Sequence, residues 1–352
     1  MPAPTVPRRD PLIEATGLTK VFRRPDKGPG LKGSLKHLVQ RRHTEHRAVD
    51  AVDLSIEAGE AVAYVGPNGA GKSTTIKMLT GILVPTAGQV RVGGIVPHEQ
   101  RIENARQIGV VFGQRTQLWW DLPVRESLAL LRDMYGIGER RYAEVLERFD
   151  EVLDIGELMP VVARKLSLGQ RMRADLAAAL LHEPPIVYLD EPTIGLDITV
   201  KDKVRAFVRE LVAGGTTVML TTHDLGDITD ICRRIVIIDE GRKIYDGPLD
   251  AVTELFARER TITFALGRPA ASLAQLAQAL PDCEVSYGAG GDGEIAVRFD
   301  RFEVAAATVL TAVLAVHEVA DVHIDEPQID AVIRQVYAGE LELPGDRTAR
   351  AR

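Results

Sequence analysis

Residues 61–74 read AVAYVGPNGAGKST, and this stretch decides the fold. AVAYV, residues 61–65, has the composition of a buried strand, and a helical pattern follows from about 72 to 79. The intervening GPNGAGKST fits G-x-x-x-x-G-K-S/T and stands between a strand and a helix, as a phosphate-binding loop requires. Its glycines let the backbone wrap around a phosphate, while amide hydrogens and the helix N-terminus face the negative charge. A merely structural glycine-rich turn is the less favoured interpretation.

The loop also predicts individual contacts. Lys72 would reach the β- and γ-phosphates, and the hydroxyl of Ser73 would complete the shell of a Mg²⁺ ion. The residues expected to bind the nucleotide here are Gly66, Pro67, Asn68, Gly69, Ala70, Gly71, Lys72, Ser73 and Thr74.

Other short apolar runs extend the pattern. They cover residues 108–112, 186–189, 218–220 and 235–238, separated by helical patterns. Runs of this kind are typical of a sheet covered on both faces, so the fold class is α/β. Strand signals are missing between about 115 and 162, where helical spacing takes over. We therefore expect a helical subdomain, about 115–170, inserted between two strands.

The sequence PIVYLDEPT, residues 185–193, is an apolar strand that ends in two carboxylates. Asp190 would hold Mg²⁺, and Glu191 is placed to polarise the attacking water. Alone, such a pair would be an ordinary solvated strand end. Together with a phosphate-binding loop it indicates a nucleotide-hydrolysing protein, but kinases, GTPases and motor ATPases share both motifs.

The segment LSLGQRMR, residues 166–173, distinguishes these classes. With it, the sequence resembles the ATP-binding subunit of ABC transporters over about residues 11–256. Phosphate loop, glutamine, LSxGQ, acidic strand, D-loop and histidine switch follow in that family's order. The resemblance implies an ABC-type nucleotide-binding domain, a RecA-like core with a helical subdomain, that binds ATP and Mg²⁺.

The resemblance assigns further roles by position. Gln114 matches the glutamine that touches Mg²⁺ at the hinge to the helical subdomain, and His223 matches the switch histidine that senses the γ-phosphate. Catalysis would then rest on Glu191, His223 and Gln114, and the metal ligands would be Ser73, Gln114 and Asp190. Asp197 matches the D-loop at the dimer interface.

The signature residues of this resemblance are Ser167, Gly169 and Gln170, which would contact the γ-phosphate bound to the other subunit. The segment reads as a short loop before a helix over 171–181, whose positive end faces that phosphate. Leu168 departs from the family, which usually has glycine there. Phe22 stands where an adenine-stacking tyrosine is common, and a core aromatic is its alternative role.

Three further segments resemble type-2 ABC exporters of the drug- or viologen-efflux group related to daunorubicin-resistance ATPases. They are FRRPDKGPGLKGSLKHLVQRRH (22–43), VVFGQRTQLWWDLP (110–123) and EPQIDAVIRQVY (326–337). This implies ATPase subunits that dimerise around two ATP, as a homodimer or a heterodimer, beneath a separately encoded membrane permease at the cytoplasmic face. A soluble ABC ATPase not tied to transport and an importer ATPase are the alternatives.

Beyond the core, residues 257–340 predict a small α/β accessory domain in the order β-α-β-β-α-β-α, with a loose tail at 341–352. The expected strands are 261–265, 284–287, 294–299 and 320–324, and the expected helices are 271–280, 303–314 and 327–337. No chemistry is assigned to this domain. Dimer contacts are favoured over regulation because its last helix is amphipathic.

Composition agrees with a globular chain: 45% of the 352 residues are hydrophobic and 26% charged. No apolar run reaches the roughly 18 residues that span a bilayer, and the first residues lack a signal-peptide core. The two cysteines, at 232 and 283, are expected to be reduced thiols. These features predict a soluble intracellular protein.

The net charge of −7 is unevenly distributed. Residues 1–50 carry +6, which leaves −13 on the rest and argues against nucleic-acid binding. The basic insert at 23–47 reads as a solvated loop or as a contact with the membrane partner or anionic headgroups. Trp119 and Trp120 would either contact that partner or pack in the helical subdomain.

Overall fold

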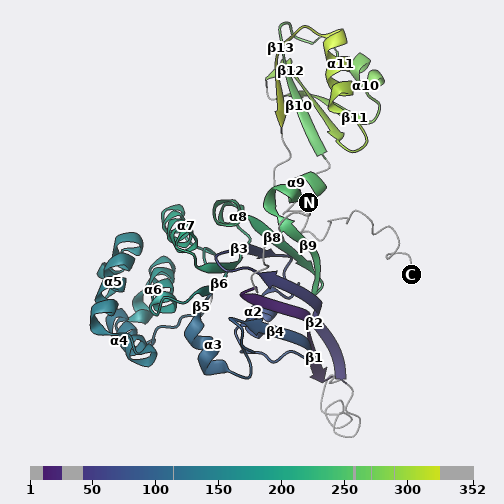
Figure 1. Ribbon diagram of the computed structural model, residues 1–352. Coiled ribbons are helices and arrows are strands. Elements are labelled where there is room, and N and C mark those ends of the chain that lie inside the picture. Colours follow the sequence, from purple (N-terminus) through teal and green to yellow (C-terminus); the bar gives the residue numbers. More distant parts are fainter. Residues whose placement is uncertain are drawn as a thin grey trace, which may run out of the picture. The chain divides into compact units, whose positions relative to one another are not determined.

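The central sheet carries the strands predicted from the apolar runs. In the computed structural model, which describes residues 11–25, 43–113, 115–256, 259–270, 272–288 and 290–325, the chain divides between Leu249 and Asp250 into two compact units. The first contains a six-stranded sheet of order β5-β6-β7-β3-β8-β9 (Figure 1). Its strands are β3 (Ala61–Val65), β5 (Ile108–Phe112), β6 (Ile186–Asp190), β7 (Thr217–Thr221), β8 (Arg234–Asp239) and β9 (Arg242–Pro248).

All strands of this sheet run parallel except β9, which pairs antiparallel with β8 at one edge. β3, β6 and β7 are buried along nearly their whole length. Strands buried on both faces need continuous apolar sequence, which is why short runs located them. The predicted α/β fold is confirmed, and the carboxyl ends of the parallel strands share one edge.

A second, three-stranded antiparallel sheet, of order β2-β1-β4, was not predicted. It consists of β1 (Ile13–Pro25), β2 (His43–Ile56) and β4 (Ala87–Val92). Its strands bury one face only, and three register shifts interrupt the pairing of β1 with β2, so no unbroken apolar run marks them. The buried side joins the core of the central sheet, where Ile13, Val52 and Tyr64 belong to one cluster.

Helices follow β5 in the chain, in the region where strand signals are missing from the sequence. They include α4 (Val124–Tyr135), α5 (Glu139–Leu153) and α6 (Leu168–Leu180), which Figure 1 shows grouped beside β5 and β6. The other helices of this unit are α2 (Lys72–Leu79), α3 (Arg101–Gln107), α7 (Ile198–Ala213) and α8 (Leu225–Ile231). The prediction that the signature helix begins at Arg171 was wrong: it begins at Leu168, because Ser167 caps it.

After α9 (Leu249–Phe256), the second unit has its own sheet of order β11-β12-β10-β13. Its elements are β10 (Glu259–Leu266), α10 (Ala274–Ala279), β11 (Cys283–Gly288), β12 (Gly291–Asp300), α11 (Ala306–Val316) and β13 (Val319–Asp325). All pairings are antiparallel, so the unit is a β-α-β-β-α-β sandwich of the ferredoxin-like kind. A separate core forms between sheet and helices around Phe264, Val297 and Val309.

The four strands predicted for this unit are confirmed, with small differences at the helices. α11 begins at Ala306 rather than 303, because Asp300 holds the preceding turn: its side chain accepts from the N–H of Phe302 and its carbonyl from the N–H of Glu303 and Val304. The helix expected at 327–337 and the tail lie outside the described residues. Within the described part of the chain, no helix is long and apolar enough to cross a membrane.

Candidate nucleotide-hydrolysis site

The carboxyl ends of β3, β6 and β7 bring three predicted motifs together. β7 lies between β3 and β6 in the sheet, so the phosphate loop, the acidic pair and the segment of His223 meet at one edge. Ligands of open α/β sheets bind at this edge. The arrangement follows from the strand order, which the sequence alone did not give.

The phosphate loop closes tightly between β3 and α2. Gly71 has φ +105°, and a Cβ there would lie 2.3 Å from the carbonyl oxygen of Ala48. A Cβ on Gly66 would lie 2.1 Å from the carbonyl oxygen of Ile238. Because only glycine fits either position, the loop can pass close to its neighbours and present its backbone N–H groups.

Lys72 lies across this loop and is almost fully buried, at 8% exposure. Its Nζ donates to the carbonyl oxygens of Gly66 at 2.5 Å and Pro67 at 3.3 Å. Burial lowers the pKa of Lys72, while the nearby carboxylates of Glu191 and Asp190 oppose that change. The ammonium is thus held against the carbonyl oxygens of the loop and close to the acidic pair.

The residues available to a magnesium ion are hydroxyl and carboxylate oxygens, which that ion prefers. Ser73 is half-buried at the start of α2, and Asp190 accepts a hydrogen bond from Thr221 Oγ1 at 2.6 Å. No cluster of three or more His, Cys, Asp or Glu side chains suited to a metal occurs among the described residues. A site made of Ser73, Asp190 and nucleotide phosphates fits these facts, since Mg²⁺ is commonly held through phosphates and few protein ligands. The third predicted ligand, Gln114, lies outside the described residues.

Glu191 and His223 face one another. His223 Nε2 is 2.9 Å from Glu191 Oε1, and the Glu191 N–H donates to the carbonyl of Thr221 at 2.9 Å. Glu191 has φ +58°, a left-handed conformation that is costly for a residue with a side chain and is common at functional sites. Burial raises the pKa of Glu191 to about 7, with Lys72 opposing and Asp190 adding to the rise. Burial, with the charge of Lys72, lowers the pKa of His223.

The raised pKa of Glu191 and the lowered pKa of His223 define the chemistry of the pair. A neutral imidazole faces a carboxyl group that titrates near neutral pH, the range in which a general base works best. The site can therefore accept a proton from a water molecule next to a phosphate held by Lys72.

The signature residues form the start of α6. Ser167 Oγ accepts from the N–H of Gln170 at 3.2 Å, and Gln170 Oε1 accepts from the N–H of Ser167 at 2.9 Å, which makes a capping box. Ser167 is exposed, and Gly169 and Gln170 are half-exposed. The N-terminal end of the helix is thus accessible to solvent.

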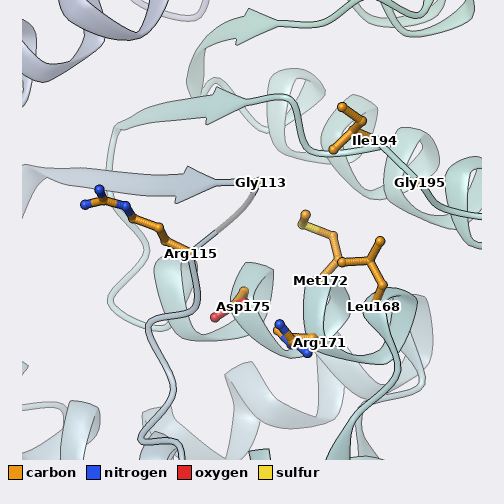
Figure 2. A pocket seen from close by; sticks show the side chains of 8 residues that line it. All are labelled: Gly113, Arg115, Leu168, Arg171, Met172, Asp175, Ile194 and Gly195. Carbon is orange, nitrogen blue, oxygen red and sulfur yellow. The ribbon is translucent and has the colours of Figure 1, made fainter. Parts of the chain in front are cut away.

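A cavity of about 330 Å³ lies beside this helix end. It is lined by Gly113, Arg115, Leu168, Arg171, Met172, Asp175, Ile194 and Gly195 (Figure 2). Leu168, which stands where the family usually has glycine, contacts the D-loop. A Cβ on Gly195 would lie 2.9 Å from Leu168 Cδ2. Signature, D-loop and the residues flanking position 114 therefore converge at one place.

One residue that ties these parts together was missed. Asp175 of α6 is buried and accepts hydrogen bonds from Thr116 Oγ1 and the N–H of Gln117, both at 2.8 Å. Burial raises its pKa, while these donors oppose the rise. The link joins the signature helix to the segment that follows Gln114. An isolated aspartate in a helix gives no sequence signal of such a role.

Two other predicted site residues, Phe22 and Asp197, lie on β1 and at the start of α7. Phe22 is half-buried on β1 opposite His46, and Lys20 Nζ lies 5.5 Å from the centre of its ring. Its role in adenine stacking stays a prediction. Asp197, two residues after Gly195 of the D-loop, caps α7 by accepting from the N–H of Val200 at 3.0 Å.

The two tryptophans are not in the core of the helical subdomain. Trp119 is 39% and Trp120 50% exposed. The guanidinium of Arg171 lies 5.3 Å from the ring of Trp120, so the exposed indole is still held against α6. The interpretation of these residues as buried core was wrong, which leaves contact with a partner as the prediction.

The fold and site define a phosphate-loop nucleotide hydrolase, and comparison with known proteins gives its family. Residues 49–194 match the family model "ABC transporter". The daunorubicin resistance ATP-binding protein DrrA3 of Streptomyces coeruleorubidus is 35% identical over 87% of this chain and 94% of its own length. The Nod factor export ATP-binding protein I of Paraburkholderia xenovorans is 35% identical over 61% of this chain and 70% of its own.

A solved structure titled as the ATP-binding subunit of an ABC transporter matches with a TM-score of 0.58 and 26% identity, over 69% of this chain and 92% of that one. The chain belongs to the ABC transporter family of ATP-binding proteins. It is an ATPase that binds and hydrolyses ATP.

Proposed function

We propose that this chain is the ATP-hydrolysing subunit of an ABC exporter, working as a dimer beneath a separate membrane permease. The contact between Glu191 and His223 beside Lys72 carries the hydrolytic part of the proposal. Export is supported by the near full-length similarity to a daunorubicin resistance protein and by the Nod factor export relative. Efflux of a drug- or viologen-like small molecule fits the first of these names.

In this mechanism the phosphate loop and Lys72 hold the ATP phosphates. Ser73 and Asp190 would hold Mg²⁺, which supplies charge neutralisation for the leaving phosphates. Glu191, as the carboxylate, orients the attacking water and takes its proton, while His223 fixes Glu191 and contacts the γ-phosphate. No cofactor beyond ATP and Mg²⁺ is needed.

The second half of each site comes from the other subunit. The exposed N-terminal end of α6, with Ser167, carries the partial positive charge of a helix N-terminus and suits a phosphate bound to a partner. Dimer closure would move the helical subdomains, and the exposed Trp119 and Trp120 would contact the permease. The protein would then work at the cytoplasmic face of the membrane, as a homodimer or a heterodimer. The accessory domain, proposed as 257–340, would add contacts to the dimer.

The chemistry is tested by replacing Glu191 and Lys72. Glu191→Gln keeps the shape of the side chain but removes the base, so we expect ATP turnover to fall at least ~100-fold with ATP affinity retained and the dimer trapped in ATP and Mg²⁺. Lys72→Ala should weaken ATP binding itself. Steady-state kinetics, nucleotide affinity and light scattering measure these quantities. Near-normal turnover by Glu191→Gln would show that another group is the base.

The partner is tested by purifying tagged Glu191→Gln from native membranes with ATP and Mg²⁺ and identifying bound proteins by mass spectrometry. A stoichiometric membrane protein, without a soluble binding protein, supports an exporter. A soluble binding protein would indicate an importer. Ribosomal or DNA-repair proteins, with the ATPase absent from membranes, would rule out transport and leave the ATPase assignment intact.

A further inference from the structure

A buried carboxylate lies behind the catalytic pair. Asp227, in the first turn of α8, is completely buried, and the proposed mechanism does not use it. Its Oδ2 accepts hydrogen bonds from Thr193 Oγ1 at 2.5 Å and Thr222 Oγ1 at 2.7 Å. Its Oδ1 accepts from Arg205 Nε at 2.7 Å. All of these partners are themselves buried or mostly buried, so the carboxylate is paired with a guanidinium and hydrogen-bonded at both oxygens, as a charge in the interior must be.

The two hydroxyl donors belong to the segments that follow two neighbouring strands. Thr193 is two residues after Glu191, in the segment that leaves β6, and Thr222 directly precedes His223 in the segment that leaves β7. One oxygen of Asp227 therefore joins the backbone that carries Glu191 to the backbone that carries His223. The side chains of Glu191 and His223 themselves meet at 2.9 Å.

Arg205 connects Asp227 to the two helices that follow these segments. The guanidinium also donates to Asp224 Oδ1 at 2.9 Å, and Lys201 Nζ donates to Asp224 Oδ2 at 2.6 Å. Asp224 in turn caps α8 by accepting from the N–H of Gly226 at 3.0 Å. α7, which begins after the D-loop, and α8, which begins after His223, are thus held together around Asp227.

We propose that Asp227 is a positioning residue, which fixes the separation of Glu191 and His223 through the hydroxyls of Thr193 and Thr222. The inference rests on the proposed function, because it assumes that this pair performs hydrolysis. Misplacing a catalytic group by about 1 Å can cost ~100-fold in rate. The hydrogen bonds of Asp227 to Thr193 and Thr222 can therefore affect turnover without contacting the nucleotide. They act on kcat and leave ATP affinity to the phosphate loop.

The sharpest test replaces Thr193, whose hydroxyl donates to Asp227. Thr193→Val keeps the buried shape and removes only the donor, whereas Thr193→Ser keeps the donor and removes a methyl group. We expect Thr193→Val to lower kcat ~10-fold or more with KM and ATP affinity unchanged, and Thr193→Ser to recover most of the turnover.

Thr222 offers the same pair of variants as a replicate. Its hydroxyl additionally accepts from the N–H of Asp224 at 3.0 Å, so Thr222→Val should have the larger effect. Since both hydroxyls share one oxygen of Asp227, the double valine variant should be non-additive with the single ones. Folding of each variant is followed by thermal melting.

Asp230 supplies a matched control. It lies one turn further along α8 and pairs with Arg209 of α7, so it joins the same two helices by the same chemistry but away from the site. Asp230→Asn should leave kcat at the wild-type value. If the valine variants were slow because α7 and α8 separate in general, Asp230→Asn would lower kcat too. That result would overturn a role specific to Asp227.

The remaining outcomes separate the two proposals. If both valine variants turn over ATP at the wild-type rate while Glu191→Gln is inactive, the positioning role is wrong and the hydrolytic site stands. If serine variants are as slow as valine variants, packing of the methyl groups and not the hydrogen bond controls the rate, and the inference fails. If Glu191→Gln itself is active, the proposed base is wrong.

Discussion

At the scale of one residue, the burial of Glu191 lowers the stability of the folded protein at neutral pH. Its folded-state pKa of about 7 lies above the ordinary value of 4.5 because burial disfavours the charge. The unfolded chain therefore loses its proton first as pH rises. Stability falls between about pH 4.5 and 7, where only the unfolded state ionises, and stays constant above that range.

Glu191→Gln removes this effect, since its side chain resembles the protonated form at every pH. We expect the variant to match the wild type near pH 4.5 and to become more stable as pH rises, by up to ~3 kcal/mol from pH 7 upward. Urea unfolding at pH 5 and pH 8 measures the difference. The exposed Glu240, which also has a positive φ of 44°, is a control: Glu240→Gln should follow the wild type at both pH values. An equal gain for Glu191→Gln at both pH values would contradict burial as the cause.

At the scale of elements, Leu168 of the signature contacts Gly195 of the D-loop. Leu168 is 42% exposed, yet its Cδ2 lies only 2.9 Å from the position that a Cβ on Gly195 would take. Gly195→Ala should therefore destabilise the protein twice, through its φ of +70° and through the contact with Leu168.

The two causes can be separated. In a Leu168→Ala background, Gly195→Ala should lose only the conformational part, about 1 kcal/mol, because the clashing carbon is gone. Gly136→Ala provides that part alone, since Gly136 has φ +69° and no atom within 4 Å of its Cβ position. Chemical unfolding of the four variants completes the comparison. Equal costs of Gly195→Ala in both backgrounds would show that Leu168 does not limit the D-loop.

The elements also show where sequence reasoning stops. A strand that is buried on both faces, such as β6, can be recognised in the sequence as an apolar run. The loop at 66–74 can be recognised by its glycines at fixed positions. The sheet of β1, β2 and β4 buries one face and breaks its register, so its pattern is too weak to locate. Asp175 and Asp227 became visible only through partners far away in the chain, because a hydrogen bond between distant segments leaves no local spacing.

At the scale of the whole molecule, each of the two units has a hydrophobic core of its own among the described residues, and these two clusters share no residue. One lies around Tyr64 and Met219 in the first unit, and the other around Phe264 and Val297 in the second. Each is continuous over its own sheet and helices, so each unit has the basis for a cooperative transition of its own.

We therefore expect calorimetry to show two unfolding transitions, of which ATP with Mg²⁺ raises only one. Ligand binding stabilises only the unit that binds, by about 2.7 kcal/mol at a hundred times Kd, and the phosphate loop belongs wholly to the first unit. Lys72→Ala should abolish the shift and leave both transitions in place. In the second unit, Phe264→Ala should lower the other transition alone, because it removes a completely buried ring. A single transition, shifted both by ATP with Mg²⁺ and by Phe264→Ala, would mean that the two units unfold together. ATP binding would then stabilise the whole chain.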